Sequence, residues 1–132
     1  MLRCLSLLKM GGRMTFIVPD TFMFLHHHSK LRKLLLTHAR IEEILIFPSR
    51  FFPGVSFGYS NLSIITLERA TREQAASCRT RIVRGFRSAS EFRLLLDENA
   101  PCGHLEIASV SQAEALAGDD HRFVLGDSAW WS

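Results

Sequence analysis

The first half of the chain alternates between apolar residues at helical spacing and short, nearly continuous apolar runs. Residues 2–10 and 29–39 have helical spacing, whereas residues 13–19 and 41–48 form apolar runs that each end in a proline. Helical spacing predicts amphipathic helices, and short runs bounded by proline are typical of buried strands. Residues 61–69 add a third predicted strand. This order of helices and strands predicts an α/β layer architecture.

The packing and capping of these elements can also be predicted. The run at 13–19 has the pattern of a parallel strand buried on both faces. Asp20 or Thr21 is suited to cap the next helix, because both side chains accept hydrogen bonds from backbone N–H groups at a helix start. One face of that helix is expected to pack on the core, and it carries Leu31, Leu34 and Leu35.

Beyond residue 69 the pattern is weaker. Residues 79–86, "RTRIVRGF", are a basic strand candidate, and residues 88–99 predict a capped amphipathic helix. The stretch 104–132 predicts a further strand, a short helix and a loose end. We therefore expect the α/β part to be followed by a poorly defined α+β tail.

The charges are distributed unevenly along the chain. Up to Arg87 there are 14 Lys and Arg residues against 5 Asp and Glu, and from Ser88 onward 2 against 8. A basic first part suits an anionic partner such as nucleic acid, although many solvent-facing surfaces are basic without one.

The cysteines and the apolar segments indicate a cytoplasmic protein. Three cysteines, at 4, 78 and 102, include no C-x-x-C pair, which argues against a disulfide scaffold or a zinc site. The first twelve residues are too short and too charged for a signal peptide, and no apolar run approaches the length of a membrane span.

Several candidate sites for chemistry fail on geometry. Three consecutive histidines, 26–28, point about 100° apart on a helix and cannot all face one ion. Gly11 and Gly12 precede a strand, whereas a phosphate-binding loop follows one. Glu42 and Glu43 are neighbours on a predicted strand, so they point to opposite faces and form no carboxylate pair. We predict no catalytic, metal-binding or cofactor-binding residue in this chain.

The loop at 48–60 is different, because it holds Phe51 and Phe52 beside Arg50. The two aromatic rings could plug the end of the sheet, since Phe is usually a core residue. Alternatively they form an aromatic platform at the strand ends, where α/β folds bind ligands and where a base removed from a duplex could stack. In that case Arg50 is placed to hold a phosphate.

Two stretches carry a resemblance to a known family. "LLKMGGRMTFIVPDTF" and "SKLRKLLLTHARIEEILIFPSRFFPGVSFGYSNLSIITLER" resemble the second half of the catalytic domain of DNA adenine-N6 methyltransferases of restriction–modification systems. The shared order is a helix ending in a Gly-Gly turn, a strand ending Ile-Val-Pro, a Lys-Leu-Arg helix, a strand, a Phe-Pro loop and a last strand. The resemblance covers roughly residues 5 to 69, and Met10 stands where the family usually has proline.

The resemblance implies part of a doubly wound, Rossmann-like methyltransferase sheet. Its last strand, residues 61–69, would run antiparallel between residues 13–19 and 41–48. Such enzymes transfer a methyl group from S-adenosylmethionine to an adenine flipped out of DNA, and an aromatic residue of the loop stacks on that base. The family's Phe-Pro falls on Phe52 and Pro53 here, so the resemblance implies that Phe52 stacks on the flipped base, with Phe51 as the neighbour that could take its place.

The family's Gly-containing cofactor loop and its Asn/Asp-Pro-Pro-Tyr/Phe motif do not occur in these residues. The resemblance therefore predicts a fragment that does not methylate by itself. Residues 1–69 would be the C-terminal part of the catalytic domain, and residues 70–132 a linker and the start of a target-recognition region. DNA is the expected partner, with the N-terminal half of such an enzyme or other restriction–modification subunits as further candidates.

Two alternatives remain open. The chain could be a non-catalytic nucleic-acid-binding or subunit-interaction module that complements a partner bearing the cofactor site. It could also belong to a methyltransferase with the same sheet that acts on RNA or protein.

Overall fold

The computed structural model describes residues 2–23, 25–51, 61–95 and 104–123. The α-helices and strands follow one another as α1 (Leu2–Leu7), β1 (Arg13–Pro19), α2 (Ser29–His38), β2 (Ala39–Pro48), β3 (Asn61–Arg69), α3 (Arg72–Ser77), β4 (Arg79–Arg84), β5 (Glu106–Ser111) and α4 (Gln112–Ala117). Short 3-10 helices lie between them, namely η1 (Asp20–Met23), η2 (His26–His28), η3 (Ser49–Phe51), η4 (Ala89–Leu95) and η5 (Asp119–His121).

All five strands belong to one mixed sheet with the order β1-β3-β2-β4-β5. Strand β3 lies antiparallel between β1 and β2, as the resemblance predicted. Strand β4 pairs parallel with β2, and β5 pairs antiparallel with β4. The strands β1, β2 and β4 therefore all run in one direction. The predicted α/β class is confirmed, and residues on both sides of Arg69 contribute to the same sheet.

Strand β1 corrects one prediction. It is not a buried parallel strand, because its pairing with β3 is antiparallel and it lies at the edge of the sheet. Its residues alternate between exposed and half-buried positions, and the side chain of Ile17 is 52 % exposed. A continuous apolar run does not distinguish a central strand from an edge strand, because the same residue types can occur in either position.

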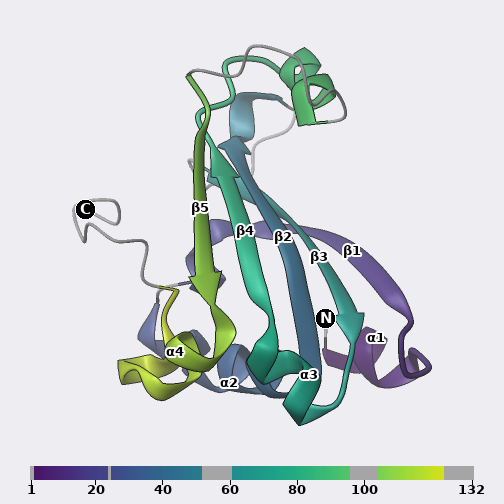
Figure 1. Cartoon of the computed structure of the whole chain (residues 1–132). Helices are drawn as coiled ribbons and strands as arrows, with labels where there is room; N and C mark the ends of the chain where they lie inside the picture. The colour runs from purple at the N-terminus through teal and green to yellow at the C-terminus, as the bar shows by residue number, and fades with distance from the viewer. Residues whose placement is uncertain (1, 24, 52–60, 96–103, 124–132) are drawn as a thin grey trace.

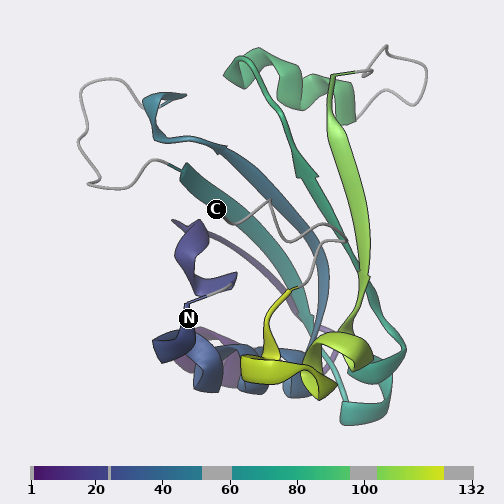
Figure 2. The same ribbon diagram turned by 90° about the vertical axis from the view of Figure 1, so that its left-hand side faces the viewer.

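The α-helices gather at one end of the sheet, whereas η4 and the end of β2 lie at the other end (Figures 1 and 2). Residues on the helix-facing side of the sheet, such as Ile44 and Ile65, pack with Leu35 and Phe123 into the larger core cluster. A second cluster, centred on Phe47, occupies the other face. No helix within the described ranges combines the length and the apolar character needed to cross a membrane.

The second half of the chain is joined to the first through a buried glutamine. The side-chain oxygen of Gln112 accepts a 2.7 Å hydrogen bond from the backbone N–H of Ile41, and its amide nitrogen donates to the carbonyl of Ala39 at 2.9 Å. Cys78 donates from its thiol to the carbonyl of Ile41. These contacts supply hydrogen-bond partners for backbone groups of β2 that β4 does not pair. They lie beside a register shift between Ile41 and Glu43.

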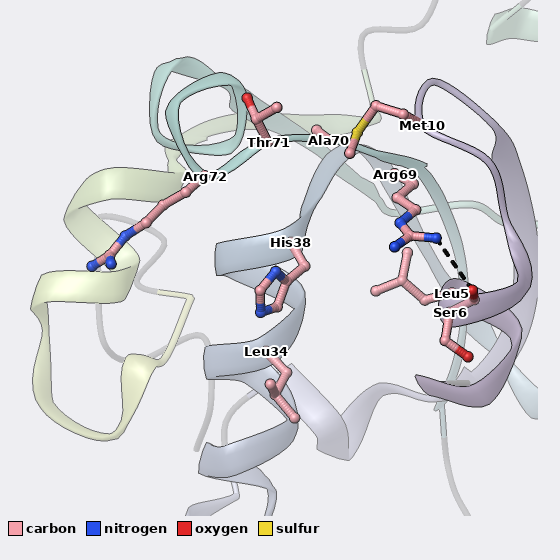
Figure 3. Close-up of a pocket in the computed structure, with 9 residues that line it drawn as sticks. All are labelled: Leu5, Ser6, Met10, Leu34, His38, Arg69, Ala70, Thr71 and Arg72. Carbon is pink, nitrogen blue, oxygen red and sulfur yellow. Dashed lines mark hydrogen bonds between the residues drawn. The ribbon is translucent and has the colours of Figure 1, made fainter.

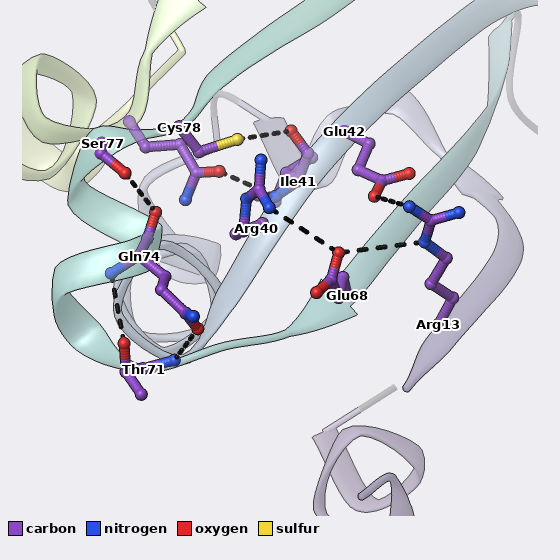
Figure 4. A network of polar contacts seen from close by, with 10 residues as sticks. Arg13, Arg40, Ile41, Glu42, Glu68, Thr71, Gln74, Ser77 and Cys78 are labelled. Carbon is purple, nitrogen blue, oxygen red and sulfur yellow. Dashed lines mark hydrogen bonds and ion pairs between the residues drawn. The ribbon is translucent and has the colours of Figure 1, made fainter. Parts of the chain in front are cut away.

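Charged side chains pair across β1, β3 and β2 near the α-helical end of the sheet, on the face opposite to the larger core cluster (Figure 4). Arg13 forms an ion pair with Glu42 at 3.1 Å, and Glu68 lies between Arg13 and Arg40. The arginine side chains of these pairs are 67 % and 44 % exposed, so solvent screens the charges and each pair adds little to stability. Helix α3 begins nearby with a capping box in which Thr71 and Gln74 satisfy each other's backbone N–H groups.

The helix predictions were right in part. Helix α2 covers the predicted segment, but Asp20 and Thr21 begin η1 instead of capping it, and no side chain caps α2. Leu35 is buried as predicted, whereas Leu34 is 41 % exposed. The predicted amphipathic helix at 88–99 is a 3-10 helix over Ala89–Leu95, and residues 96–103 lie outside the described part of the chain.

Candidate nucleic-acid interface

The candidate site lies at the edge of the sheet where the three co-directional strands end. Strands β1, β2 and β4 end at Pro19, Pro48 and Arg84, and each is followed by a turn or a 3-10 helix. In open α/β sheets ligands bind outside the carboxyl ends of such strands. The loop that the sequence singled out begins at this edge, directly after β2.

Phe51 is held inside an aromatic cluster. Its ring stacks on Phe47 with centroids 5.7 Å apart and meets Phe92 edge-on at 6.1 Å. Phe92 in turn contacts Phe86 at 4.6 Å. Phe51 is half-buried, and the cluster packs on the face of the sheet opposite to the helices. The ring therefore already has an intramolecular stacking partner, which is the sheet-plugging role that the sequence left open for this residue.

Phe52 lies outside the described residues, and its role in stacking on a base stays a prediction. It follows Phe51 directly in the chain. The packing of Phe51 and the position of Pro48 place the start of the loop at the carboxyl edge. The proposed stacking on a flipped base is therefore assigned to Phe52.

Arg50 is exposed and lies beside the aromatic cluster. Its guanidinium carbon is 5.5 Å from the centroid of the Phe51 ring, and its Nη2 donates a 3.4 Å hydrogen bond to the backbone carbonyl of Arg87. In the described part of the chain it forms no ion pair with a carboxylate. Arg87 is also exposed, and the hydrogen bond to its backbone carbonyl joins η3 to the segment that follows β4.

Arg87 was not singled out as a site residue from the sequence. Its backbone follows β4 after Gly85, whose φ of +96° turns the chain at the strand end. The available signal was the charge distribution, because Arg87 is the last residue of the basic part of the chain. Periodicity could not show that it lies next to Arg50, since the two residues are 37 positions apart.

Two acidic groups at this edge are Asp20 and Glu91. The Glu91 carboxylate accepts a 2.8 Å hydrogen bond from the backbone N–H of Arg87. Partial burial raises the pKa of the Asp20 carboxyl above its ordinary value, because desolvation disfavours the charged form. A hydrogen bond with the side chain of Asn61 opposes that effect. Asp20 begins η1 directly after β1, and Asn61 is the first residue of β3, so the two elements are tied at the same end of the sheet.

The histidines and glycines have other contacts. His26 forms an ion pair with Asp120 at 2.9 Å, and His27 lies against His28 with ring centroids 4.1 Å apart. Across the described ranges, no three or more His, Cys, Asp or Glu side chains come together as a metal site would require. Gly11, with φ of +83°, makes the turn into the amino end of β1.

Comparison with known proteins places the resemblance in the first part of the chain. Residues 1–52 match the family described as Eco57I restriction-modification methylase. Two proteins of Haemophilus influenzae, the type II methyltransferases M.HincII and M.HindII, are each 42% identical over 50 residues. That stretch is 37% of this chain and 10% of either relative, so the chain matches about a tenth of their length. The predicted resemblance to restriction–modification methyltransferases is confirmed over this segment.

Proposed function

We propose that this chain is the C-terminal part of the catalytic domain of a DNA adenine-N6 methyltransferase of a restriction–modification system. In this proposal residues 1–69 complete a Rossmann-like methyltransferase sheet and residues 70–132 lead into the target-recognition region. Phe52 stacks on the flipped adenine, and Arg50 holds a DNA phosphate. The single observation that carries the proposal is the match of residues 1–52 to the methylase family.

The geometry of the described residues supports this role. The antiparallel strand β3 between β1 and β2 is the arrangement expected at the end of such a sheet. Arg50 brings an exposed positive charge to the carboxyl edge, where a phosphate would be favoured by charge-assisted hydrogen bonds. A base that leaves the duplex needs a stacking surface next to such a phosphate contact.

The donor in this reaction is S-adenosylmethionine, which supplies the methyl group. The residues that the structure describes do not fit a site for it. The Gly11–Gly12 turn lies at the amino end of β1, opposite to the edge where a cofactor loop would lie. We therefore assign no cofactor contact and no step of methyl transfer to these residues. Their proposed role is to complete the sheet, to stack on the flipped base and to bind a phosphate of the DNA backbone.

The test uses this chain joined or co-expressed with a segment that carries the cofactor loop and the Asn-Pro-Pro-Tyr motif. The rate of methyl transfer to duplex DNA is measured for Phe52→Ala and for Phe52→Tyr. Loss of one base–aromatic stack is worth about 1–3 kcal/mol, so Phe52→Ala is expected to slow methylation by roughly tenfold or more. Phe52→Tyr keeps the aromatic face and should retain most of the rate.

A second substrate sharpens the test. Opposite a mismatch the adenine is already partly unstacked, so the defect of Phe52→Ala is expected to become smaller. An unchanged rate of Phe52→Ala on duplex DNA would remove Phe52 from the site. Methylation of RNA or protein, with none of DNA adenine, would favour a methyltransferase with the same sheet and another substrate. It would overturn the adenine assignment.

The open edge of β1 favours one alternative, a module that completes a partner bearing the cofactor site. Among the described residues strand β1 pairs only with β3, so in this part of the chain its outer N–H and C=O groups are available to another strand. An aliphatic row crosses the face opposite to the α-helices at one level of the register, from β1 to β5: Ile17, Ile64, Leu45, Val83 and Ile107. Its end residues Ile17 and Ile107 are 52 % and 53 % exposed.

This alternative is tested with Ile17→Lys and Ile107→Lys as a matched pair. Both residues are on edge strands and equally exposed, but only Ile17 lies on the β1 edge. If a separate chain with the cofactor motifs pairs with β1, Ile17→Lys should weaken the purified complex by tenfold or more, and Ile107→Lys should not. Equal affinity of both variants and the parent chain would exclude docking at β1.

A further inference from the structure

A pocket of about 480 Å³ lies at the end of the sheet opposite to the candidate interface (Figure 3). It is bounded by α1, the second half of α2 and the turn from β3 into α3. Its residues precede β1 and β2, or lie at the last residue of β3 and directly after it. Strand β2 has ten residues, which separates the pocket from Arg50 by about 30 Å. The volume is in the range of pockets that bind small molecules, about 300–1,000 Å³.

The lining of the pocket is mainly apolar. Leu5 and Ala70 are buried at its base, and Met10 and Leu34 form walls that are 56 % and 41 % exposed. Leu34 is the residue of α2 that was expected in the core and is not there. A ligand body placed against these side chains would cover large aliphatic groups that now face water, which is favourable.

Three side chains of the lining can carry positive charge. Figure 3 shows that Arg72 points away from the other two, the Arg69 guanidinium and the His38 ring. Arg69 donates through Nη1 to the backbone carbonyls of Ser6 and Leu8, which anchors the guanidinium against the end of α1. Within the described part of the chain its Nε–H and Nη2–H groups donate no hydrogen bond, and neither Arg69 nor His38 forms an ion pair. A partly buried cation without an acidic partner is complementary to an anion.

We propose that this pocket binds a small organic anion, with an aromatic or aliphatic body and a single carboxylate or sulfonate. The apolar body lies between Met10, Leu34 and Leu5, and the anionic group accepts hydrogen bonds from the free edge of Arg69 and from His38. Because the bound anion touches α1, α2 and the β3–α3 turn at once, it also holds α1 against the sheet. This site is separate from the candidate interface and does not depend on the proposed function.

Binding is measured on the 132-residue chain by isothermal titration calorimetry with 2-naphthoate and with 2-naphthalenemethanol. The two probes share the aromatic body, but only the first carries a charge. We expect saturable 1:1 binding of the carboxylate, about tenfold tighter than the alcohol, because a charge-assisted hydrogen bond is worth about 1.5–3 kcal/mol.

Three variants locate the site. Arg69→Gln removes the charge while keeping a donor for the carbonyls of α1, and it should weaken naphthoate about tenfold. Leu34→Glu, at an exposed wall position, should abolish measurable binding. Lys33→Gln is the matched control, since Lys33 is an exposed cation of the same helix that does not line the pocket. It should leave the affinity unchanged.

Three results would overturn the proposal. The first is the absence of saturable naphthoate binding to the parent chain. The second is equal affinity for the alcohol, which would make the pocket an apolar contact surface for another protein segment. The third is an equal loss in Lys33→Gln and Leu34→Glu, which would show that the probe binds by general charge attraction. If Arg69→Gln fails to fold by circular dichroism, the two probes and Leu34→Glu still decide the outcome.

Discussion

The ring of Phe51 stacks on the ring of Phe47, with centroids 5.7 Å apart and an interplanar angle of 15°. Phe47 is the penultimate residue of β2 and is 2 % exposed, so Phe51 packs against a buried residue at the end of the strand. This contact indicates that Phe51 anchors the start of the loop. The proposed base contact is assigned to Phe52 by the resemblance.

Phe51→Ala is therefore expected to lower the free energy of unfolding. Truncating a half-buried ring should cost about 2 kcal/mol, below the 3–5 kcal/mol typical of fully buried Phe. Phe51→Leu keeps most of the apolar contact with Phe47 and Phe92 and should lose less than half as much. Urea denaturation of the three proteins measures the difference. A variant Phe51→Ala as stable as the parent would mean that the ring does not anchor the loop.

Gln112 is expected to be as important for stability as an apolar core residue. Gln112→Ala leaves the N–H of Ile41 and the carbonyl of Ala39 without their buried partner, at a cost of about 2–4 kcal/mol. Gln74→Ala is a suitable control, because Gln74 is exposed and its loss removes only half of a capping box, about 0.5–1 kcal/mol. Denaturation midpoints compare the two. Equal losses would contradict the bridging role of Gln112.

The order of elements could be predicted from the sequence to a large extent. Strand β3 has the predicted bounds 61–69, and helix α2 and strand β2 lie within a residue or two of the predicted ones. Their apolar periodicity is strong and proline or glycine marks their ends. The antiparallel placement of β3 came from the family resemblance, because periodicity carries no information about which strands pair.

Arg32 shows why the rest could not be predicted. It is a charged residue within α2, yet it is fully buried and donates to the backbone carbonyls of Phe22, Leu25 and Asp120. These partners are 7 to 88 residues away. A sequence pattern predicts that an arginine faces solvent. It does not show that distant segments of the chain will supply backbone carbonyl groups as buried partners.

The candidate site has the same limit. The loop after β2 and Arg50 could be found from composition and resemblance, and the resemblance assigned the base contact to Phe52. The sequence did not show that Phe51 packs in an aromatic cluster, because that packing depends on Phe92, a residue of η4 more than forty positions away. Arg87 was likewise visible only as a charge until the turn at Gly85 brought it next to Arg50.

Gly85 is expected to tolerate no side chain. Its φ is +96°, and a Cβ atom there would lie 2.8 Å from the carbonyl oxygen of His104. Gly85→Ala should therefore cost about 1–3 kcal/mol and disturb the position of Arg87. Gly118 is the matched control, because its φ is −78° and the nearest atom to an added Cβ is 3.5 Å away. Gly118→Ala should be neutral or stabilising by up to about 1 kcal/mol.

Asp20 and Asp120 are expected to respond to pH with opposite sign. The pKa of Asp20 is raised from 3.8 by desolvation, so its charged form is disfavoured in the folded protein. Its contribution to stability is fully present below pH 3.8 and is lost as the pH rises through the folded pKa. Asp20→Asn should thus make the protein more stable than the parent at pH 7, and this advantage should shrink on acidification.

The pKa of Asp120 is lowered from 3.8, chiefly by its hydrogen bond with His26. Its contribution is present above pH 3.8 and is lost as the pH falls through the folded pKa. Asp120→Asn, which still suits the left-handed backbone at φ of 54°, should be less stable than the parent at pH 7, by an amount that vanishes in acid. Urea denaturation of both variants between pH 2.5 and 7 measures these differences. Because the two substitutions remove the same charge, differences of the same sign at pH 7 would show that net charge governs the response, and would contradict the local cause given for each carboxylate.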